Sequence, residues 1–133
     1  FSVVTSSLRY SEGQSLFTDT TLFHTDGDPN PWFEVYLQTA LVVRSVTLQL
    51  RGNVYCAREH DVMVTAGTKL SNRKCGVQRP APPGVSCQNK TVTIQCDVPT
   101  VSNYLKLNIT KPCTGFGCCG NMNCFNFVKM VIN

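Results

Sequence analysis

Apolar and polar residues alternate with a period of two along several short stretches of the chain. Such alternation is typical of strands that bury one face and expose the other. In 32–37 the apolar positions are Phe33, Val35 and Leu37, and in 125–132 Val128 and Met130 share one face with Ile132. The alternating stretches are WFEVYL (32–37), RSVTLQL (44–50), DVMVTA (61–66), TVTIQC (91–96), NYLKLNI (103–109) and FNFVKMVI (125–132).

Turn-forming sequences separate these stretches, and none of the intervening segments has a helical repeat of useful length. GDPNP (27–31), RPAPPG (79–84) and CTGFGCCGNMN (113–123) are rich in Gly, Pro and Asn, the residues that favour turns. Many short strands, polar turns and no helices predict an all-β fold, an antiparallel β-sandwich or jelly roll. The 133 residues fit one domain, 1–133, which is long enough to bury a core of its own.

Eight cysteines and two Asn-x-Thr sequons, at Asn89 and Asn108, indicate the compartment. An even number of cysteines at this density predicts a disulfide-braced, secreted or extracellular protein with glycosylation at the two sequons. A zinc site would need paired Cys-x-x-Cys or Cys/His blocks, which are not found. The cysteines are Cys56, Cys75, Cys87, Cys96, Cys113, Cys118, Cys119 and Cys124.

A cysteine-rich loop is expected at 111–124, where four cysteines and three glycines fall in KPCTGFGCCGNMNC. Such a segment buries little apolar surface, so disulfides are expected to fix it. Adjacent Cys118 and Cys119 could bond to each other in a strained ring or each to a distant partner, and the geometry that disulfides prefer favours the distant partners.

The charge pattern and the distribution of acids exclude several classes of function. A net charge of +4 from scattered lysines and arginines lacks the basic stripe with interleaved aromatics that nucleic acid binding requires. No apolar run is long enough for a transmembrane segment and no signal peptide opens the chain, so we expect a mature segment or one module of a larger ectodomain. No nucleophile stands in a recognisable arrangement and no carboxylate pair is marked out, so we expect no catalysis.

The candidate site comes from the spacing of His24, Arg51, Asn53 and Arg58. Two arginines offer forked donors that can hold several sugar hydroxyls, or equally a carboxylate or sulfate, and a histidine adds a donor or acceptor. This spacing resembles the fucose-binding motif of the F-type lectins (fucolectins), in which the order is His, Arg, Asp, then Arg or Lys. The flank HTDGDPNPWFEVYL resembles that family's H-T-x-G-D-x-N-P-W-W-x-V-D-L block, and SVTLQLRGN resembles the strand that enters the binding loop.

The resemblance covers roughly 6–110, and FVKMVIN stands where the family's last strand would be. It implies a jelly-roll domain in which His24, Arg51 and Arg58 bind the hydroxyls of a terminal fucose. It also implies a disulfide between Cys75 and Cys96. The pairing of the other six cysteines stays open, because six cysteines allow fifteen pairings.

Three departures separate the chain from the family's pattern. Asn53 replaces the family's Asp, which leaves the arginines more electropositive. Val54 and Tyr55 stand where the family has adjacent cysteines, so Tyr55 either substitutes as the platform for the sugar or fills the pocket. The family's calcium loop has no counterpart in SEGQSLFTDTTLF, and Lys129 aligns with a calcium-binding glutamate, so no calcium or other cofactor is expected.

These observations lead to a carbohydrate-recognition module that binds fucosylated glycans or glycoproteins without catalysis, through His24, Arg51, Asn53, Tyr55 and Arg58, with Phe23 against the sugar ring. The alternative is an adhesion domain for a cell-surface protein that keeps the scaffold and has lost sugar and calcium binding. A weaker third hypothesis is an anionic glycan or a membrane surface. In the non-functional alternative, the arginines only form ion pairs with Glu59, Asp61 or Glu34. Trp32 is expected in the core.

Overall fold

The structure, a computed structural model, describes residues 2–5, 24–78, 87–114 and 118–133. The strands are β1 (Ser2–Thr5), β2 (Trp32–Leu50), β3 (Val62–Gly67), β4 (Asn72–Val77), β5 (Thr91–Ile109) and β6 (Phe127–Ile132). A short 3₁₀ helix, η2 (Val54–Arg58), follows β2. All strand pairings are antiparallel. In the described part of the chain, no helix is long and apolar enough to cross a membrane.

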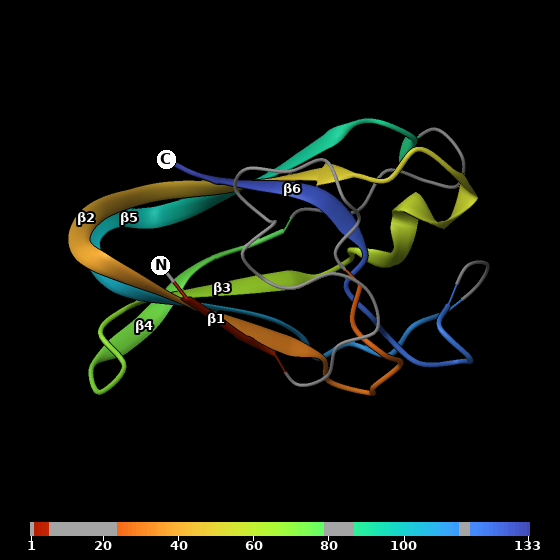
Figure 1. The fold of residues 1–133 in the computed structure, drawn as a ribbon, viewed down its shortest axis with the longest axis horizontal. Helices are drawn as coiled ribbons and strands as arrows, with labels where there is room; N and C mark the ends of the chain where they lie inside the picture. The colour runs from red at the N-terminus through yellow and green to blue at the C-terminus, as the bar shows by residue number, and fades with distance from the viewer. Residues whose placement is uncertain (1, 6–23, 79–86, 115–117) are drawn as a thin grey trace.

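Strands β2 and β5 are 19 residues each and run antiparallel to one another through most of their length. Their register shifts between Tyr36 and Leu41 and again between Val43 and Ser45. Such irregularities bend a strand pair, and Figure 1 shows the two strands turning back together at one end of the molecule. One hydrogen-bonded sheet therefore folds over to make both layers of a sandwich.

Each half of the bent pair carries its own neighbours. The Trp32 end of β2 pairs with β1, and the Leu50 end pairs with β6. The Ile109 end of β5 pairs with β3, which in turn pairs with β4. The expected β-sandwich is confirmed, but WFEVYL and RSVTLQL belong to one strand rather than two, as do TVTIQC and NYLKLNI.

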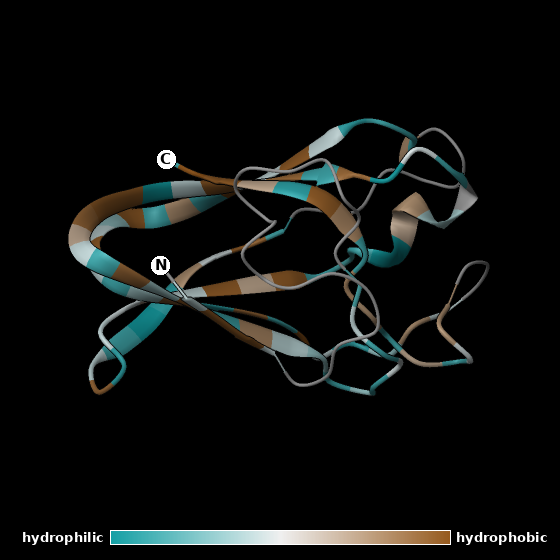
Figure 2. Ribbon diagram, viewed as in Figure 1, coloured by the Kyte–Doolittle hydropathy of each residue, from teal (hydrophilic) through white to brown (hydrophobic). Residues whose placement is uncertain are grey.

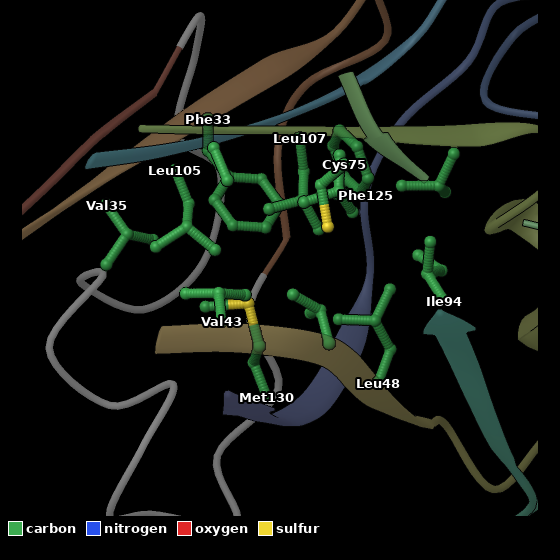
Figure 3. Packing of buried hydrophobic residues seen from close by; sticks show 14 of the residues in the cluster. Phe33, Val35, Val43, Leu48, Cys75, Ile94, Leu105, Leu107, Phe125 and Met130 are labelled. Carbon is green, nitrogen blue, oxygen red and sulfur yellow. The ribbon is translucent and has the colours of Figure 1, made fainter. Parts of the chain in front are cut away.

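The core lies between the two layers and is built from the predicted apolar faces. Phe33, Phe125 and Phe127 contact one another, with ring centroids 4.9 to 6.3 Å apart. Figure 3 shows Phe33 and Leu107 on one side of the core and Leu48 and Met130 on the other. Figure 2 shows the corresponding alternation of hydrophobic and hydrophilic residues along the strands.

Trp32 is not in the core, contrary to the expectation. The alternation that buries Phe33 and Val35 turns Trp32 to the outer face, where it is half-buried and Lys106 Nζ lies 5.4 Å from the centre of its ring. The aliphatic stem of a lysine can cover such an aromatic face while its charge stays in water. The period of the strand therefore decides on which face Trp32 lies, and the size of its side chain does not.

Four disulfides brace the described residues. Cys75 pairs with Cys96, as the resemblance implies, and so links β4 to the part of β5 that lies in the other layer. Beside this link a Cβ on Gly76 would lie 2.0 Å from the carbonyl oxygen of Gln95, so only glycine permits the close approach of the backbones. The remaining pairs are Cys56–Cys87, Cys113–Cys118 and Cys119–Cys124.

The pairing of Cys118 and Cys119 differs from both alternatives considered for them. They do not bond to each other, and their partners are not distant, because Cys113 and Cys124 are each five residues away. The cysteine-rich loop is thus closed by two small rings of its own. A short loop needs only local pairs to fix its backbone, so the disulfides there do not tie it to the sandwich.

Candidate functional site

The candidate site lies at the end of the sandwich opposite the bend of β2 and β5, where η2, the segment that begins at His24 and the cysteine-rich loop meet (Figure 1). The segment is joined by hydrogen bonds to Phe125, the residue that follows the loop directly. Thr25 N donates to Phe125 O at 2.9 Å, and Phe125 N donates to Thr25 Oγ1 at 3.0 Å. Residues about 100 positions apart are thereby held side by side.

Arg51 and Arg58 are held at the two ends of a rigid connection. The backbone of Arg51 accepts a hydrogen bond from Asn89 N at 3.2 Å, and Cys56 within η2 is tied to Cys87 by a disulfide. Asn53 caps η2, because its Oδ1 accepts from Tyr55 N at 3.0 Å. An N-cap oxygen satisfies a backbone donor that the helix leaves unpaired, so Asn53 acts on the backbone of η2.

The two arginines converge on a single amide, that of Asn126. With the Asn126 oxygen facing them, it accepts from Nη1 of Arg51 and from Nη1 of Arg58, each at 3.1 Å. The nitrogen then donates to the two carboxylate oxygens of Glu59 at 3.0 and 3.1 Å, and the backbone N of Asn126 also donates to Glu59 Oε1 at 2.5 Å. This orientation is the one that gives both ends of the amide a complementary partner. The amide of Asn126 therefore links the two arginines to Glu59 by hydrogen bonds, and this link is called the relay below.

Glu59 lies fully buried behind this relay. Burial raises the pKa of Glu59 to about 8, although the hydrogen bond from the Asn126 backbone and the charges of Arg58 and Arg51 act in the opposite direction. Desolvation disfavours the charged form of a carboxyl group and is opposed by donors and cations. Glu59 therefore titrates near neutral to mildly alkaline pH.

His24 contacts Arg58 and is 4% exposed. Its Nδ1 lies 2.5 Å from the carbonyl oxygen of Thr25, which can only accept, so Nδ1 carries the proton. Nε2 then accepts from Arg58 Nη1 at 3.2 Å. Both ring nitrogens thus have protein partners, and the contacts of His24 fix the position of the Arg58 guanidinium.

Tyr55 stacks on the arginine pair. The Cζ atom of Arg58 lies 4.4 Å from the ring centre and that of Arg51 lies 5.5 Å from it, while the side chain keeps 38% of its surface exposed. Cations are attracted to the face of an aromatic ring at these distances. Arg51 Nε is buried with no hydrogen-bond partner among the residues described.

The structure therefore brings His24, Arg51, Tyr55 and Arg58 together, and Asn53 lies at the start of η2 beside them. Phe23 and the stretch SEGQSLFTDTTLF fall outside the described residues. Lys129 lies exposed on β6 opposite Gln49, and whether calcium binds stays a prediction. Asn89 is exposed and Asn108 is half-buried on β5, and their glycosylation also stays a prediction.

A disulfide lies next to the site. A ring nitrogen of His24 and the sulfurs of Cys119 and Cys124 are within 4.8 Å of one another. Metal ions bind cysteine as the thiolate, whereas these two sulfurs are bonded to each other. This group is therefore part of the wall of the site.

Two members of the site were not predicted as functional residues, Asn126 and Glu59. The sequence indicates Glu59 only as an ion-pair partner because it follows Arg58 directly. Asn126 stands between two core phenylalanines in FNF, and a polar residue on the face opposite two buried ones gives no sign of the partner it meets. Glu34 and Asp61 do not pair with the arginines, since Glu34 bonds to Lys69 and Asp61 to His60 and Lys111.

Comparison with known proteins gives the same picture in sequence and in fold. No family model matches the chain. Over 97 residues the chain is 28% identical to Fucolectin-1 of Anguilla japonica, an alignment that covers 71% of this chain and 53% of that protein. The chain spans about half the length of this curated relative.

Several solved structures have the same fold at low sequence identity. The lectin domain of lectinolysin complexed with Lewis B antigen matches with a TM-score of 0.72 at 13% identity, covering 98% of this chain and 90% of that one. A fucolectin from Morone saxatilis serum matches with a TM-score of 0.70 at 16% identity, covering 98% and 45%. A Clostridium perfringens CBM32 module in complex with GalNAc-β-1,3-galactose matches with a TM-score of 0.73 at 10% identity, covering 98% and 92%.

These relatives are lectins and carbohydrate-binding modules, and their solved folds are the sandwich described above. The resemblance to the F-type lectins is thus confirmed, by sequence similarity to a fucolectin and by the fold of fucose-binding modules. The chain is a disulfide-braced antiparallel β-sandwich with the jelly-roll fold of these solved lectin domains.

Proposed function

We propose that the chain binds glycans that carry terminal L-fucose, through the guanidinium groups of Arg51 and Arg58 with Tyr55 beside them. The observation that carries this proposal is the convergence of both arginines on the Asn126 oxygen and on the face of one tyrosine. A rigid pair of forked donors suits the vicinal hydroxyls of a sugar ring. A curated protein named as a fucolectin and a solved fucose-binding module with the same fold support this ligand.

In this proposal His24 and Asn126 position the arginines and Tyr55 offers an apolar edge to the sugar. Asn53 holds the first turn of η2 so that Tyr55 and Arg58 keep their relative places. Phe23 is proposed to meet the sugar ring from the segment that precedes His24. The chain performs no reaction on its ligand and uses no calcium, and the four disulfides suit a place outside the cell, alone or within a larger ectodomain.

The proposal treats 1–133 as one domain with one fucose site at the loop end. A fucosylated trisaccharide titrated into the chain by calorimetry tests it. Arg51→Ala and Arg58→Ala are each expected to weaken binding by about 100-fold or more, since each removes hydrogen bonds from a charged group. The matched control is Arg73→Ala, which removes an exposed arginine of β4 and should leave binding unchanged. Full binding by both site variants would contradict the proposal.

A second candidate function is recognition of a cell-surface protein through the same end of the molecule. It is favoured by the state of His24, which is 4% exposed and has both ring nitrogens engaged within the chain. In that case a glycan array gives no hits, and binding to cells survives enzymatic removal of their glycans. Loss of cell binding on deglycosylation would favour the fucose site.

A further inference from the structure

A second hollow lies at the other end of the sandwich, beneath the turn that joins β3 to β4. Its volume is about 290 Å³. β2 and β5 form its floor and the turn forms its side, and the residues that matter most are Tyr36, Leu37, Lys69, Leu70, Asn103 and Tyr104. In Figure 1 this turn and η2 lie at opposite ends of the molecule.

The floor of the hollow is built around a buried carboxylate, Glu34, which is 7% exposed. Lys69 Nζ donates to Glu34 Oε2 at 2.6 Å, and the hydroxyl of Tyr104 donates to the same oxygen. Tyr36 Oη donates to it from 3.4 Å. Charge-assisted bonds of this kind are stronger than neutral ones, so the ion pair holds the turn against the sheet and fixes the side of the hollow.

The surfaces that remain around this hollow combine apolar and polar groups. The rings of Tyr36 and Tyr104 meet edge to face with centroids 5.4 Å apart, and Leu70 stands at the rim with 99% of its surface exposed. Asn103, on β5, is exposed and lines the same hollow with its amide side chain. The hollow thus offers an aromatic edge, a leucine and an exposed amide.

We propose that this hollow is a second carbohydrate-binding site, which takes one ring of a neutral pyranose. The amide of Asn103 would bind its hydroxyls, and Tyr36 and Leu70 would cover its C–H face. This inference does not depend on the arginine site, because it uses none of its residues.

The chemistry of the hollow favours a neutral sugar over a charged ligand. Lys69 and Glu34 neutralise each other at 2.6 Å, so no isolated charge is left to select an ion. The volume is at the lower end of the range for small-molecule sites, which are concave, largely apolar and carry few polar groups. One sugar ring suits a hollow of this size better than a peptide segment does.

The two sites are too far apart to share one sugar. β3 runs between them from Val62 to Gly67, a length of roughly 17 Å at ~3.3 Å per residue. A single domain with two such sites would bind two branches or two glycans at once. Weak sites linked in this way gain avidity without any new contact.

Backbone amide shifts in two-dimensional NMR spectra test the second site. The methyl glycosides of glucose, galactose, mannose and N-acetylglucosamine are each titrated into the isotope-labelled chain. We expect at least one of them to shift the amides of 68–71 and 103–104 in a saturable way. No shift there with any of the four sugars would overturn the proposal.

Variants of exposed residues separate binding from folding. Asn103→Ala and Leu70→Ala are each expected to weaken that sugar by ~5-fold, the effect of losing one hydrogen bond or a small apolar contact. Val98→Ala is the control, because Val98 is 55% exposed and does not line the hollow. Unchanged affinity in both site variants would overturn the proposal, whereas Arg58→Ala should leave these shifts intact whatever the fate of the fucose site.

Discussion

Among the residues that the structure describes, one glutamate is buried at each end of the sandwich, and the two glutamates are partnered in opposite ways. At the turn between β3 and β4, Glu34 accepts directly from the ammonium of Lys69 at 2.6 Å. At the loop end, Glu59 accepts from the neutral amide of Asn126, which in turn accepts from Arg51 and Arg58. In one case the cation reaches the acid, and in the other an amide stands between them.

The pKa values of the two acids follow this difference. Burial raises the pKa of Glu34, but the hydrogen bonds from Lys69 and Tyr104 and the charge of Lys69 outweigh it, so the net shift is downward. Burial dominates at Glu59 and raises its pKa to about 8. At Glu34 the ammonium of Lys69 is bound by the acid and stabilises the fold. At the loop end the neutral oxygen of Asn126 holds the guanidinium groups of Arg51 and Arg58 in place.

The largest effect is expected from removing the relay. Asn126→Leu leaves the buried carboxyl of Glu59 and the buried edge of Arg51 without the amide that joins them. We expect the free energy of unfolding to fall by about 3 kcal/mol, because buried polar groups that lose their partners are costly. Urea unfolding measures this, and Asn103→Leu, at an exposed amide of the other end, is the control. Equal stability of the two variants would contradict the relay.

The pH dependence of stability distinguishes the two acids. The folded chain keeps on Glu59 a proton that the unfolded chain releases near its ordinary pKa of 4.5. The contribution of Glu59 to the free energy of unfolding therefore falls as the pH rises from about 4.5 to about 8, and is flat above that. The free energy of unfolding is measured against pH for the wild type and for Glu59→Gln, and the difference between the two profiles isolates this slope. We expect that difference to change by a few kcal/mol in total over this pH range. A difference profile that rises over this range would contradict the assignment.

Glu34 should show the opposite and smaller trend. Because its folded pKa is lowered, its contribution is present above the unfolded value of 4.5 and is lost as the pH falls through the folded value. Glu34→Gln should therefore lower stability at pH 7 and have less effect in strong acid. Thermal unfolding at both pH values checks this, and a constant difference would show that Glu34 is not ionised in the folded chain.

Exchanging the acid and the amide of the relay makes the loop end resemble the Glu34 end. In the double variant Glu59→Gln with Asn126→Asp, an amide lies behind a carboxylate that faces Arg51 and Arg58. The hydrogen bonds are kept, but a carboxylate in place of the neutral amide now meets the arginines directly, as Glu34 meets Lys69. We expect stability close to that of the wild type and weaker glycan binding, by ~10-fold, since the new acceptor holds the guanidinium donors more strongly. Undiminished glycan affinity in a folded double variant would contradict a role for the neutral amide.

Tyr55→Ala should produce the smallest change. The ring adds a cation–π contact to Arg58 at 4.4 Å and to Arg51 at 5.5 Å, worth about 0.5–1 kcal/mol at an exposed place. We expect glycan affinity to fall by about 3- to 5-fold with little change in melting temperature. A marked gain in affinity would mean that Tyr55 covers the site instead of supporting the sugar.

The fold was largely predictable because its signal is local. The alternation in 32–37 and 44–50 buries Phe33, Val35, Leu48 and their neighbours as expected. The bend that merges these stretches into one strand was not predictable, because it depends on register shifts against β5. Trp32 lies outside the core because the period of the strand, and not the size of the side chain, decides which face it takes.

The site was predictable only where a motif marks it. The spacing of His24, Arg51 and Arg58 pointed to residues that do meet, although 34 positions separate the bonded His24 and Arg58. Asn126 is distant in sequence from Arg51 and Glu59, and nothing local indicates that it joins them. The pairing of Cys113 with Cys118 and of Cys119 with Cys124 depends likewise on how the loop closes in space.

We propose that Arg51 and Arg58 bind the glycan as one unit. A double-mutant cycle in calorimetry with a fucosylated trisaccharide tests it most directly, using Arg51→Lys, Arg58→Lys and both together. Since lysine keeps the charge but loses the fork, each single variant should weaken binding by about 10-fold. The double variant should weaken it little further, with a coupling energy of about 1 kcal/mol. Strictly additive losses, or no loss in either single variant, would contradict the account.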